Sequence, residues 1–212
     1  MKYYIVGIVL FAIFAVLALL VTSNNPQITK LDYSGFTAIN NPHSKIINQL
    51  MVSLTKYGRE AVWIATTALL FVFGGADGRR TATLLVISFI ILIPLGTVLK
   101  DEIDRPRPTS VNPDNILVKE TDPSFPSGHA VIVSGGAFVM LARFNKGKQI
   151  IPSLILLAEA FLVIYSRVYV GDHYPLDVVS GILVGTGLSA FVVGSSKYLN
   201  PVFSRLDSIR KK

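Results

Sequence analysis

The chain has 212 residues, of which 51% are hydrophobic and 16% charged, and its mean hydropathy of +0.54 is far above that of a typical soluble domain. The formal net charge is +7, but the basic residues are scattered among apolar segments, which disfavours nucleic-acid binding. The absence of cysteine excludes disulfides and thiolate metal sites. We therefore expect a polytopic membrane protein.

The first predicted span is Tyr3–Thr22, an uncharged run of twenty residues. A helix of that length crosses a hydrocarbon core of roughly 30 Å. A signal peptide is the alternative interpretation. The following stretch, TSNNPQ, lacks a small-x-small cleavage site, and the apolar run is longer than a usual signal core. We favour an uncleaved span.

Five further apolar runs follow, and with the first they predict one all-α domain, residues 1–212, built as an integral membrane bundle of six transmembrane helices. These runs are Ala61–Gly74, Thr81–Leu99, Gly128–Ala142, Ile150–Tyr165 and Val178–Gly194. Small residues in SGGA of the fourth run and SGILVGTGLSA of the sixth permit close helix packing. Glu159, inside the fifth run, is expected to face a cavity or a partner, because an ionised group in lipid is costly.

An amphipathic segment lies between the first two spans. Its apolar residues share one helical face, which predicts either a helix lying in the membrane interface or an extension of the second span. The apolar positions are Ile46, Ile47, Leu50, Met51 and Leu54.

Six spans place both termini and the 75–80 and 143–149 turns on one side of the membrane, and residues 23–60, 100–127 and 166–177 on the other. The first side carries eleven basic and two acidic residues, and the second carries nine basic and ten acidic. Because Lys and Arg are retained on the cytoplasmic side, we expect cytoplasmic termini, an outward-facing second side and a plasma-membrane location.

Three polar segments lie on that outward side, each where a span meets a loop. They are KDEIDRPRP from Lys100, FPSGHA from Phe125 and SRVYVGDHYPLD from Ser166. Cations beside a helix N-terminus form an anion site, and arginine suits phosphate because its guanidinium donates paired hydrogen bonds. The segments therefore predict that four helix ends converge on a phosphate site.

Two histidines supply the chemistry for such a site. A neutral imidazole can attack phosphorus, and a second imidazole can protonate the leaving oxygen. Asp177 follows His173 by four residues and can fix its tautomer. Pro175 favours the first helical position, however, so helical spacing alone does not guarantee that pairing.

These segments together resemble the signature of the type 2 phosphatidic acid phosphatase family. The pattern is Lys, six residues, Arg-Pro; then Pro-Ser-Gly-His; then Ser-Arg, five residues, His, three residues, Asp. The eleven matching positions are Lys100, Arg107, Pro108, Pro126, Ser127, Gly128, His129, Ser166, Arg167, His173 and Asp177. The six-residue spacing selects Arg107, and Arg105 is interpreted as a neighbour. The first 60 residues show no such resemblance.

The resemblance implies a metal-independent phosphatase without a cofactor. His173 is then the nucleophile, Asp177 orients it, and His129 is the general acid. The phosphate would be bound by Lys100, Arg107, Ser127, Gly128 and Arg167. Asp101, Glu102 and Asp104 suggest a divalent-ion site at most weakly, and a solvated acidic surface is the favoured interpretation.

A site level with the headgroups suits a lipid phosphate, whose tail stays in the bilayer. The expected substrate is a polyprenyl diphosphate, with phosphatidic acid and phosphatidylglycerol phosphate as alternatives. A lipid phosphotransferase would use the same residues. A non-catalytic protein that binds or carries anionic lipid would need the cations but not the His173 and Asp177 pair. The sequence leaves the oligomeric state open.

Overall fold

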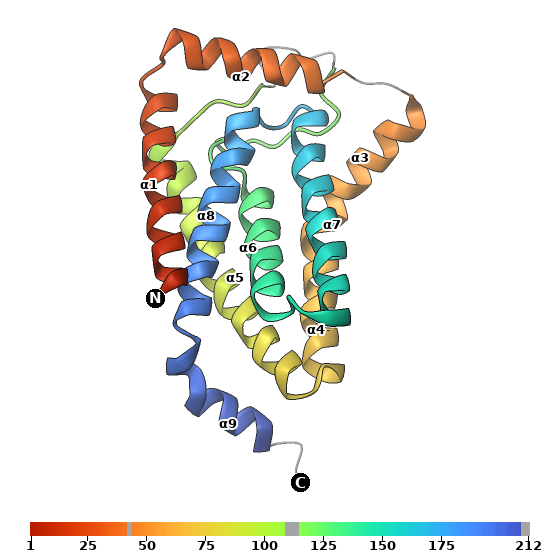
Figure 1. Cartoon of the computed structure of the whole chain (residues 1–212). Coiled ribbons are helices and arrows are strands. Elements are labelled where there is room, and N and C mark those ends of the chain that lie inside the picture. The colour runs from red at the N-terminus through yellow and green to blue at the C-terminus, as the bar shows by residue number, and fades with distance from the viewer. Residues whose placement is uncertain (42–43, 109–114, 209–212) are drawn as a thin grey trace.

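The computed structural model describes residues 1–41, 44–108 and 115–208. These residues form helices and no strand, which confirms the all-α prediction for this part of the chain (Figure 1). The α-helices are α1 (Lys2–Thr22), α2 (Pro26–Ile39), α3 (Lys45–Tyr57), α4 (Trp63–Phe73), α5 (Gly75–Ile103), α6 (Gly128–Arg143), α7 (Ile150–Tyr169), α8 (Pro175–Gly194) and α9 (Asn200–Ser208).

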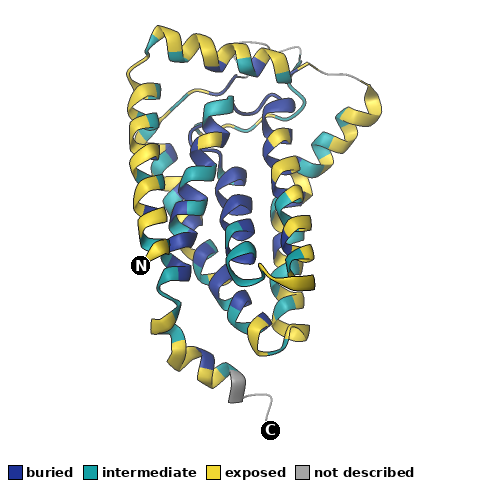
Figure 2. Ribbon diagram, in the orientation of Figure 1, coloured by how far each residue is buried: buried dark blue, intermediate teal, exposed yellow. Residues whose placement is uncertain are grey.

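Helix α6 lies at the centre of the bundle and packs against α5, α7 and α8. Helix α1 packs on α8, and α4 packs on α5. Figure 2 shows that α6 is buried along most of its length, whereas α1, α2 and α3 are largely exposed. Between its two end residues, the exposed side chains of α1 are apolar, as expected for a helix that faces lipid.

Glycines allow the central helices to approach closely, as the small residues in both runs predicted. A Cβ on Gly185 of α8 would lie 2.1 Å from the carbonyl oxygen of Val131 in α6. A Cβ on Gly136 of α6 would lie 2.3 Å from the Trp63 ring of α4. Any larger side chain at these positions would push the helices apart.

Within the part of the chain that the structure describes, four helical segments are long and apolar enough to cross a membrane. They are Lys2–Thr22, Gly75–Ile103, Gly147–Tyr169 and Pro175–Gly194. Helix α6 is apolar but shorter, and α4 has only eleven residues. The first, third, fifth and sixth predicted runs thus fall within long apolar helices, and the second and fourth correspond to the shorter α4 and α6.

Helix α4 is the continuation of the amphipathic helix α3. The two are joined by a π-helical turn, Gly58–Val62, so the interpretation as an extension of the second span describes the chain path. Ile46 and Leu50 of α3 remain exposed. Glu159 of α7 faces this turn, because its Oε1 lies 3.1 Å from the place that a Cβ on Gly58 would take.

Helix α2 lies across one end of the bundle and was not predicted (Figure 1). Its start is well defined, since the Asn25 side chain accepts hydrogen bonds from the Gln27 and Ile28 amides and Pro26 occupies the first turn. The start of α1 and helix α9 lie toward the opposite end (Figure 1).

Candidate active site

The three polar segments meet at the end of the bundle that α2 covers. Lys100 is in the last turn of α5, Ser127 is the N-cap of α6, and Arg167 is in the last turn of α7. The Ser127 amide donates to the Asp177 carbonyl at 2.9 Å, so the start of α6 touches the start of α8. The four helix ends predicted to converge do so in the structure.

His173 is fully buried in the loop before α8. The helix begins at Pro175, as its preference for the first position suggested, yet the loop still brings His173 Nδ1 to 3.5 Å from Asp177 Oδ2. On the other side of the ring, Arg107 Nη1 lies 3.3 Å from Nε2. Because a guanidinium can only donate, Nε2 carries the lone pair and Nδ1 carries the proton that faces Asp177.

The protonation of His173 follows from its surroundings. Burial, together with the positive charges of Arg167 and Arg107, holds the pKa of His173 well below the usual histidine value. The ring is therefore neutral at pH 7, with its Nε2 lone pair directed toward the guanidinium of Arg107.

Arg107 is buried and binds several oxygen atoms at once. It donates from Nε to the Asp122 carbonyl at 2.6 Å and from Nη1 to the Asp172 carbonyl at 3.0 Å. Its Nη2 donates to the carboxylates of Glu120 and Asp122 at 2.9 and 2.8 Å. Arg107, which is predicted to bind the phosphate, thus lies beside the candidate nucleophile His173 in a fixed orientation.

The two other predicted cations complete the same cluster. Arg167 is fully buried and donates to Glu120 at 2.8 Å and to Asp172. Lys100 pairs with Asp122. Because Glu120 also binds Arg107, one carboxylate bridges the two arginines.

Three acidic residues that sequence reasoning did not assign therefore occupy the site. Burial raises the pKa of Glu120, but Arg167 and Arg107 outweigh it and hold that pKa below its usual value. Lys100 and Arg107 likewise lower the pKa of Asp122 against the effect of burial. The Glu120 and Asp122 side chains are 33% and 51% exposed, so both reach solvent. As ionised carboxylates they accept hydrogen bonds from Lys100, Arg107 and Arg167, the same donors that would suit phosphate oxygens.

Asp172 differs because it is fully buried. Its Oδ2 lies 2.7 Å from Arg107 Nη1 and 3.6 Å from His173 Nε2. Burial raises the pKa of Asp172 despite the attraction of Arg167 and Arg107.

His129, in the first turn of α6, is held by an element outside the three polar segments. Its Nε2 lies 3.0 Å from the carbonyl oxygen of Thr55 in α3. A carbonyl only accepts, so Nε2 carries the proton and Nδ1 is the acceptor, 3.5 Å from Arg59 Nη1. The Thr55 hydroxyl lies 3.3 Å from Arg167 Nη1 and 2.9 Å from the Ser166 hydroxyl, which links α3 to the cation cluster.

Ser127 and Gly128 leave room beside His129. Ser127 is buried, and among the described residues its Oγ has no hydrogen-bond partner. A Cβ on Gly128 would make only an ordinary contact, with Arg59 Nη1 at 3.8 Å, so the backbone here is not crowded. A ligand can therefore approach the start of α6 closely.

Arg105, which the sequence suggested was only a neighbour, contacts the candidate catalytic carboxylate. Its Nη1 lies 2.5 Å from Asp177 Oδ1, and its Nη2 lies 2.6 Å from Oδ2 of Asp32 in α2. Asp32 also accepts from the Leu176 amide at 2.8 Å, and Arg105 stacks on the Tyr174 ring at 4.3 Å. Helix α2 is thereby connected to Asp177 through Arg105.

One group of side chains has the composition of a metal site. Ligand atoms of Glu120, Asp172 and His173 lie within 4.8 Å of one another. The carboxylates already bind Arg107 and Arg167, whose positive charges oppose a cation at the same place. With two arginines among these carboxylates, the site suits an anion bound by arginine better than a divalent metal ion. Asp101, Glu102 and Asp104 are exposed at the end of α5.

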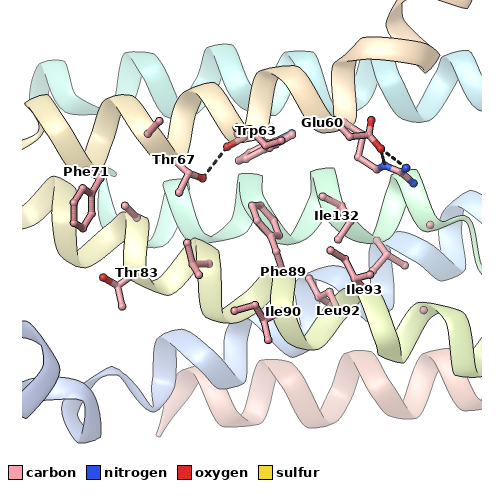
Figure 3. Close-up of a pocket in the computed structure, with 18 of the residues that line it drawn as sticks. Glu60, Trp63, Thr67, Phe71, Thr83, Phe89, Ile90, Leu92, Ile93 and Ile132 are labelled. Atoms are coloured by element: carbon pink, nitrogen blue, oxygen red, sulfur yellow. Dashed lines mark hydrogen bonds and ion pairs between the residues drawn. The ribbon is translucent and has the colours of Figure 1, made fainter.

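A cavity of about 1040 Å³ opens beside the site, between α4 and α5. Its charged lining residues, Arg59, Glu60, Lys100 and Asp122, belong to the segments around the site, and most of the rest are apolar. Figure 3 shows Glu60 at one end of this cavity and Phe71 and Thr83 toward the other. The cavity therefore joins a charged end to a long hydrophobic groove.

Comparison with known proteins gives a matching family and a similar curated protein. The model of the PAP2 superfamily matches residues 81–201. The chain is 44% identical over 189 residues to an undecaprenyl-diphosphatase of Sulfolobus acidocaldarius, with 88% of each protein covered.

Two solved structures share the fold. The first transmembrane PAP2 type phosphatidylglycerolphosphate phosphatase from Bacillus subtilis superimposes with a TM-score of 0.72 at 25% identity, covering 91% of this chain and 96% of that one. LpxE of Aquifex aeolicus superimposes with a TM-score of 0.67 at 27% identity, covering 77% and 95%.

Proposed function

Because the chain belongs to the PAP2 superfamily, we propose that it is a membrane phosphatase that hydrolyses a polyprenyl diphosphate through a phosphohistidine on His173. The observation that carries this proposal is the setting of His173. Its Nδ1 faces Asp177, its Nε2 lone pair faces Arg107, and Arg167 and Lys100 belong to the same cluster. A neutral imidazole among fixed cations is what attack on a phosphate requires.

In the first step, the Nε2 lone pair of His173 forms a bond to phosphorus while the bond from phosphorus to the leaving oxygen breaks. His129 takes a proton on Nδ1 when the anionic substrate binds, so that both ring nitrogens are protonated, and it then gives the Nδ1 proton to that oxygen. The Thr55 carbonyl keeps the ring oriented through Nε2. Asp177 stabilises the positive charge that develops on the His173 ring.

In the second step, water attacks the phosphorus and the bond to His173 breaks. His129 takes the proton from the water through Nδ1 and returns to its starting state. Lys100, Arg107 and Arg167 bind the phosphoryl oxygens in both steps, with Ser127 and Gly128 at the start of α6. They place positive charge where negative charge develops.

In this mechanism Glu120 and Asp122 occupy the phosphate-binding position when no substrate is bound. In the ligand-free protein they accept hydrogen bonds from the three cations that bind the phosphate. Both side chains are partly exposed, so they can leave when a phosphate group enters. Asp172 is buried beneath them and keeps Arg107 and Arg167 together.

We also propose six membrane spans, with cytoplasmic termini and an outward-facing site in the plasma membrane. The two shorter spans would be α6 and α4, the latter extended through the π-helical turn into α3. The excess of basic residues at the end that holds the termini supports this orientation.

Cysteine labelling tests the orientation, because the native chain has no cysteine. Lys30 lies exposed on α2 and Lys148 lies exposed in the turn before α7. In sealed cells, K30C should react with a membrane-impermeant maleimide and K148C only after lysis. The reverse pattern would overturn the proposed orientation.

Polyprenyl diphosphate is preferred over other lipid phosphates because the 44%-identical relative is an undecaprenyl-diphosphatase and the groove beside the site suits a long apolar chain. The decisive assay is phosphate release by purified protein, in excess chelator, from polyprenyl diphosphate, phosphatidic acid and phosphatidylglycerol phosphate. We expect metal-independent release from the diphosphate. Folded protein that releases no phosphate would favour the phosphotransferase or carrier alternatives.

A further inference from the structure

We propose that Arg59 binds the second phosphate of a diphosphate substrate, on the leaving-group side of the site. This inference rests on the proposed function and makes it more specific, because it separates diphosphates from monophosphates. Arg59 lies outside all three polar segments, in the π-helical turn between α3 and α4. Such turns recur at functional sites in helical proteins.

The two edges of the Arg59 guanidinium contact different groups, and these contacts fix its orientation. Its Nε lies 2.6 Å from Glu60 Oε1, and its Nη2 also pairs with that oxygen. The remaining group, Nη1, points the other way and lies 3.5 Å from His129 Nδ1. Glu60 therefore holds one edge of the guanidinium and leaves the other edge facing the start of α6.

The chemistry of a diphosphate places its inner phosphate at this edge. His173 attacks the outer phosphorus, so the bridging oxygen must lie where His129 Nδ1 can protonate it. The inner phosphorus is bonded to that same oxygen. Its free oxygens therefore lie within reach of any donor beside Nδ1, and Arg59 Nη1 is such a donor.

Three further features fit an anion at this place. Arg59 Nη1 lies next to Gly128, 3.8 Å from the place that a Cβ on this glycine would take, so the guanidinium is beside the start of α6. The Ser127 hydroxyl is buried and, within the described ranges, has no partner. The first amides of α6 lack a side-chain cap, so they too are available to an anion.

The groove accounts for the rest of the substrate. Arg59 and Lys100 are among its lining residues. Glu60, the neighbour of Arg59 in the chain, lies at one end of the groove, and the apolar walls of α4 and α5 extend away from it (Figure 3). A polyprenyl chain attached to the inner phosphate can enter the groove from this point. A monophosphate ester has no second phosphate there and gains nothing from Arg59 at its leaving group.

A matched pair of substrates tests the role of Arg59: a polyprenyl diphosphate and the monophosphate of the same prenyl chain. R59Q should lower kcat/KM for the diphosphate by about 10- to 100-fold, the loss expected for charged hydrogen bonds. The loss of kcat/KM for the monophosphate should be at least 10-fold smaller than the loss for the diphosphate. R59K keeps the charge and should fall between R59Q and the native protein.

The control is K56Q. Lys56 lies three residues earlier and stacks on Tyr57, so it carries the same charge without facing His129. K56Q should leave both substrates unaffected. Equal losses on both substrates in R59Q would mean that Arg59 acts only through His129, and no loss on either would remove it from the site. Both results would overturn the proposal.

A binding measurement keeps this test separate from the proposed function. A non-hydrolysable prenyl bisphosphonate and the matching monophosphonate can be titrated into folded H173A protein. R59Q in that background should weaken bisphosphonate binding about 10-fold or more relative to the monophosphonate. If no variant with an intact His173 releases phosphate but R59Q still weakens bisphosphonate binding more than monophosphonate binding, the phosphatase is rejected and the subsite is kept. If R59Q weakens the binding of both ligands equally, the subsite is rejected.

Discussion

Residues 100–177 and residues 26–60 contribute to the same site in different ways. The first region supplies the two histidines and the cations of the cluster, and its residue spacing identifies them. The second region carries no recognisable motif, yet Asp32, Thr55 and Arg59 reach into the site from it. In the proposed mechanism the motif supplies the reacting groups, and the N-terminal helices contact several of them and hold their orientation.

The largest effect should come from the motif itself. H173A removes the nucleophile and should reduce phosphate release by about 10³-fold or more. Thermal melting of the purified variant would confirm that it is folded. Substantial turnover in folded H173A would remove His173 from the reaction and with it the proposed mechanism.

The next effect tests the link from α2 to Asp177. R105Q removes the charged donor to Asp177 Oδ1 and should lower kcat by about 10- to 100-fold while KM changes little, because Arg105 is a positioning residue that need not touch substrate. D32N should act in the same direction, and R105K should recover part of the loss.

The control for this pair is K30Q, which changes an exposed residue on the same helix as Asp32 and should be silent. A rise in KM with unchanged kcat in R105Q would assign Arg105 to substrate binding instead of positioning.

A smaller effect is expected at Thr55. T55V removes the hydroxyl between Arg167 and Ser166 but retains the backbone carbonyl that holds His129. Loss of the bond with Ser166 and of the long bond from Arg167 should reduce kcat/KM by about 3- to 10-fold, and T55S should restore it. An unimpaired T55V would contradict this role of the hydroxyl, and a T55S as impaired as T55V would mean that the packing of the methyl group is required as well.

The smallest effect has the opposite sign. E120Q removes a carboxylate that competes with phosphate for Arg107 and Arg167, so KM should fall by about 2- to 5-fold. The competition persists below the usual pH range of glutamate because its pKa is lowered, and it fades as pH falls through that lowered pKa. E102Q, at an exposed position, is the control. A higher KM in E120Q would mean that Glu120 supports binding.

The sequence predicted well which residues would lie together, because the residue types and spacing of the motif mark the helix ends that converge. Lys100, Arg107, His129, Arg167 and His173 all lie at the converging helix ends. Apolar length also predicted the long helices. It also located α4, predicted as Ala61–Gly74 and observed as Trp63–Phe73, but it did not predict the π-helical turn that joins this helix to the amphipathic α3.

The supporting residues could not be found in the same way. Asp32 looks like a solvated carboxylate on an amphipathic helix, and Arg59 beside Glu60 looks like a surface ion pair. Their roles depend on contacts with residues about 70 positions away, which spacing within one segment does not encode. One available signal was Asn25-Pro26, a typical helix start that places Asp32 in a helix.

The most direct test of the central claim is to find the covalent intermediate. Protein mixed with polyprenyl diphosphate labelled in its outer phosphate is quenched in alkali, which preserves phosphohistidine, and the labelled peptide is identified by mass spectrometry. We predict label on His173 in the native protein and none in H173A. Label on another residue, or full turnover by H173A, would contradict the account.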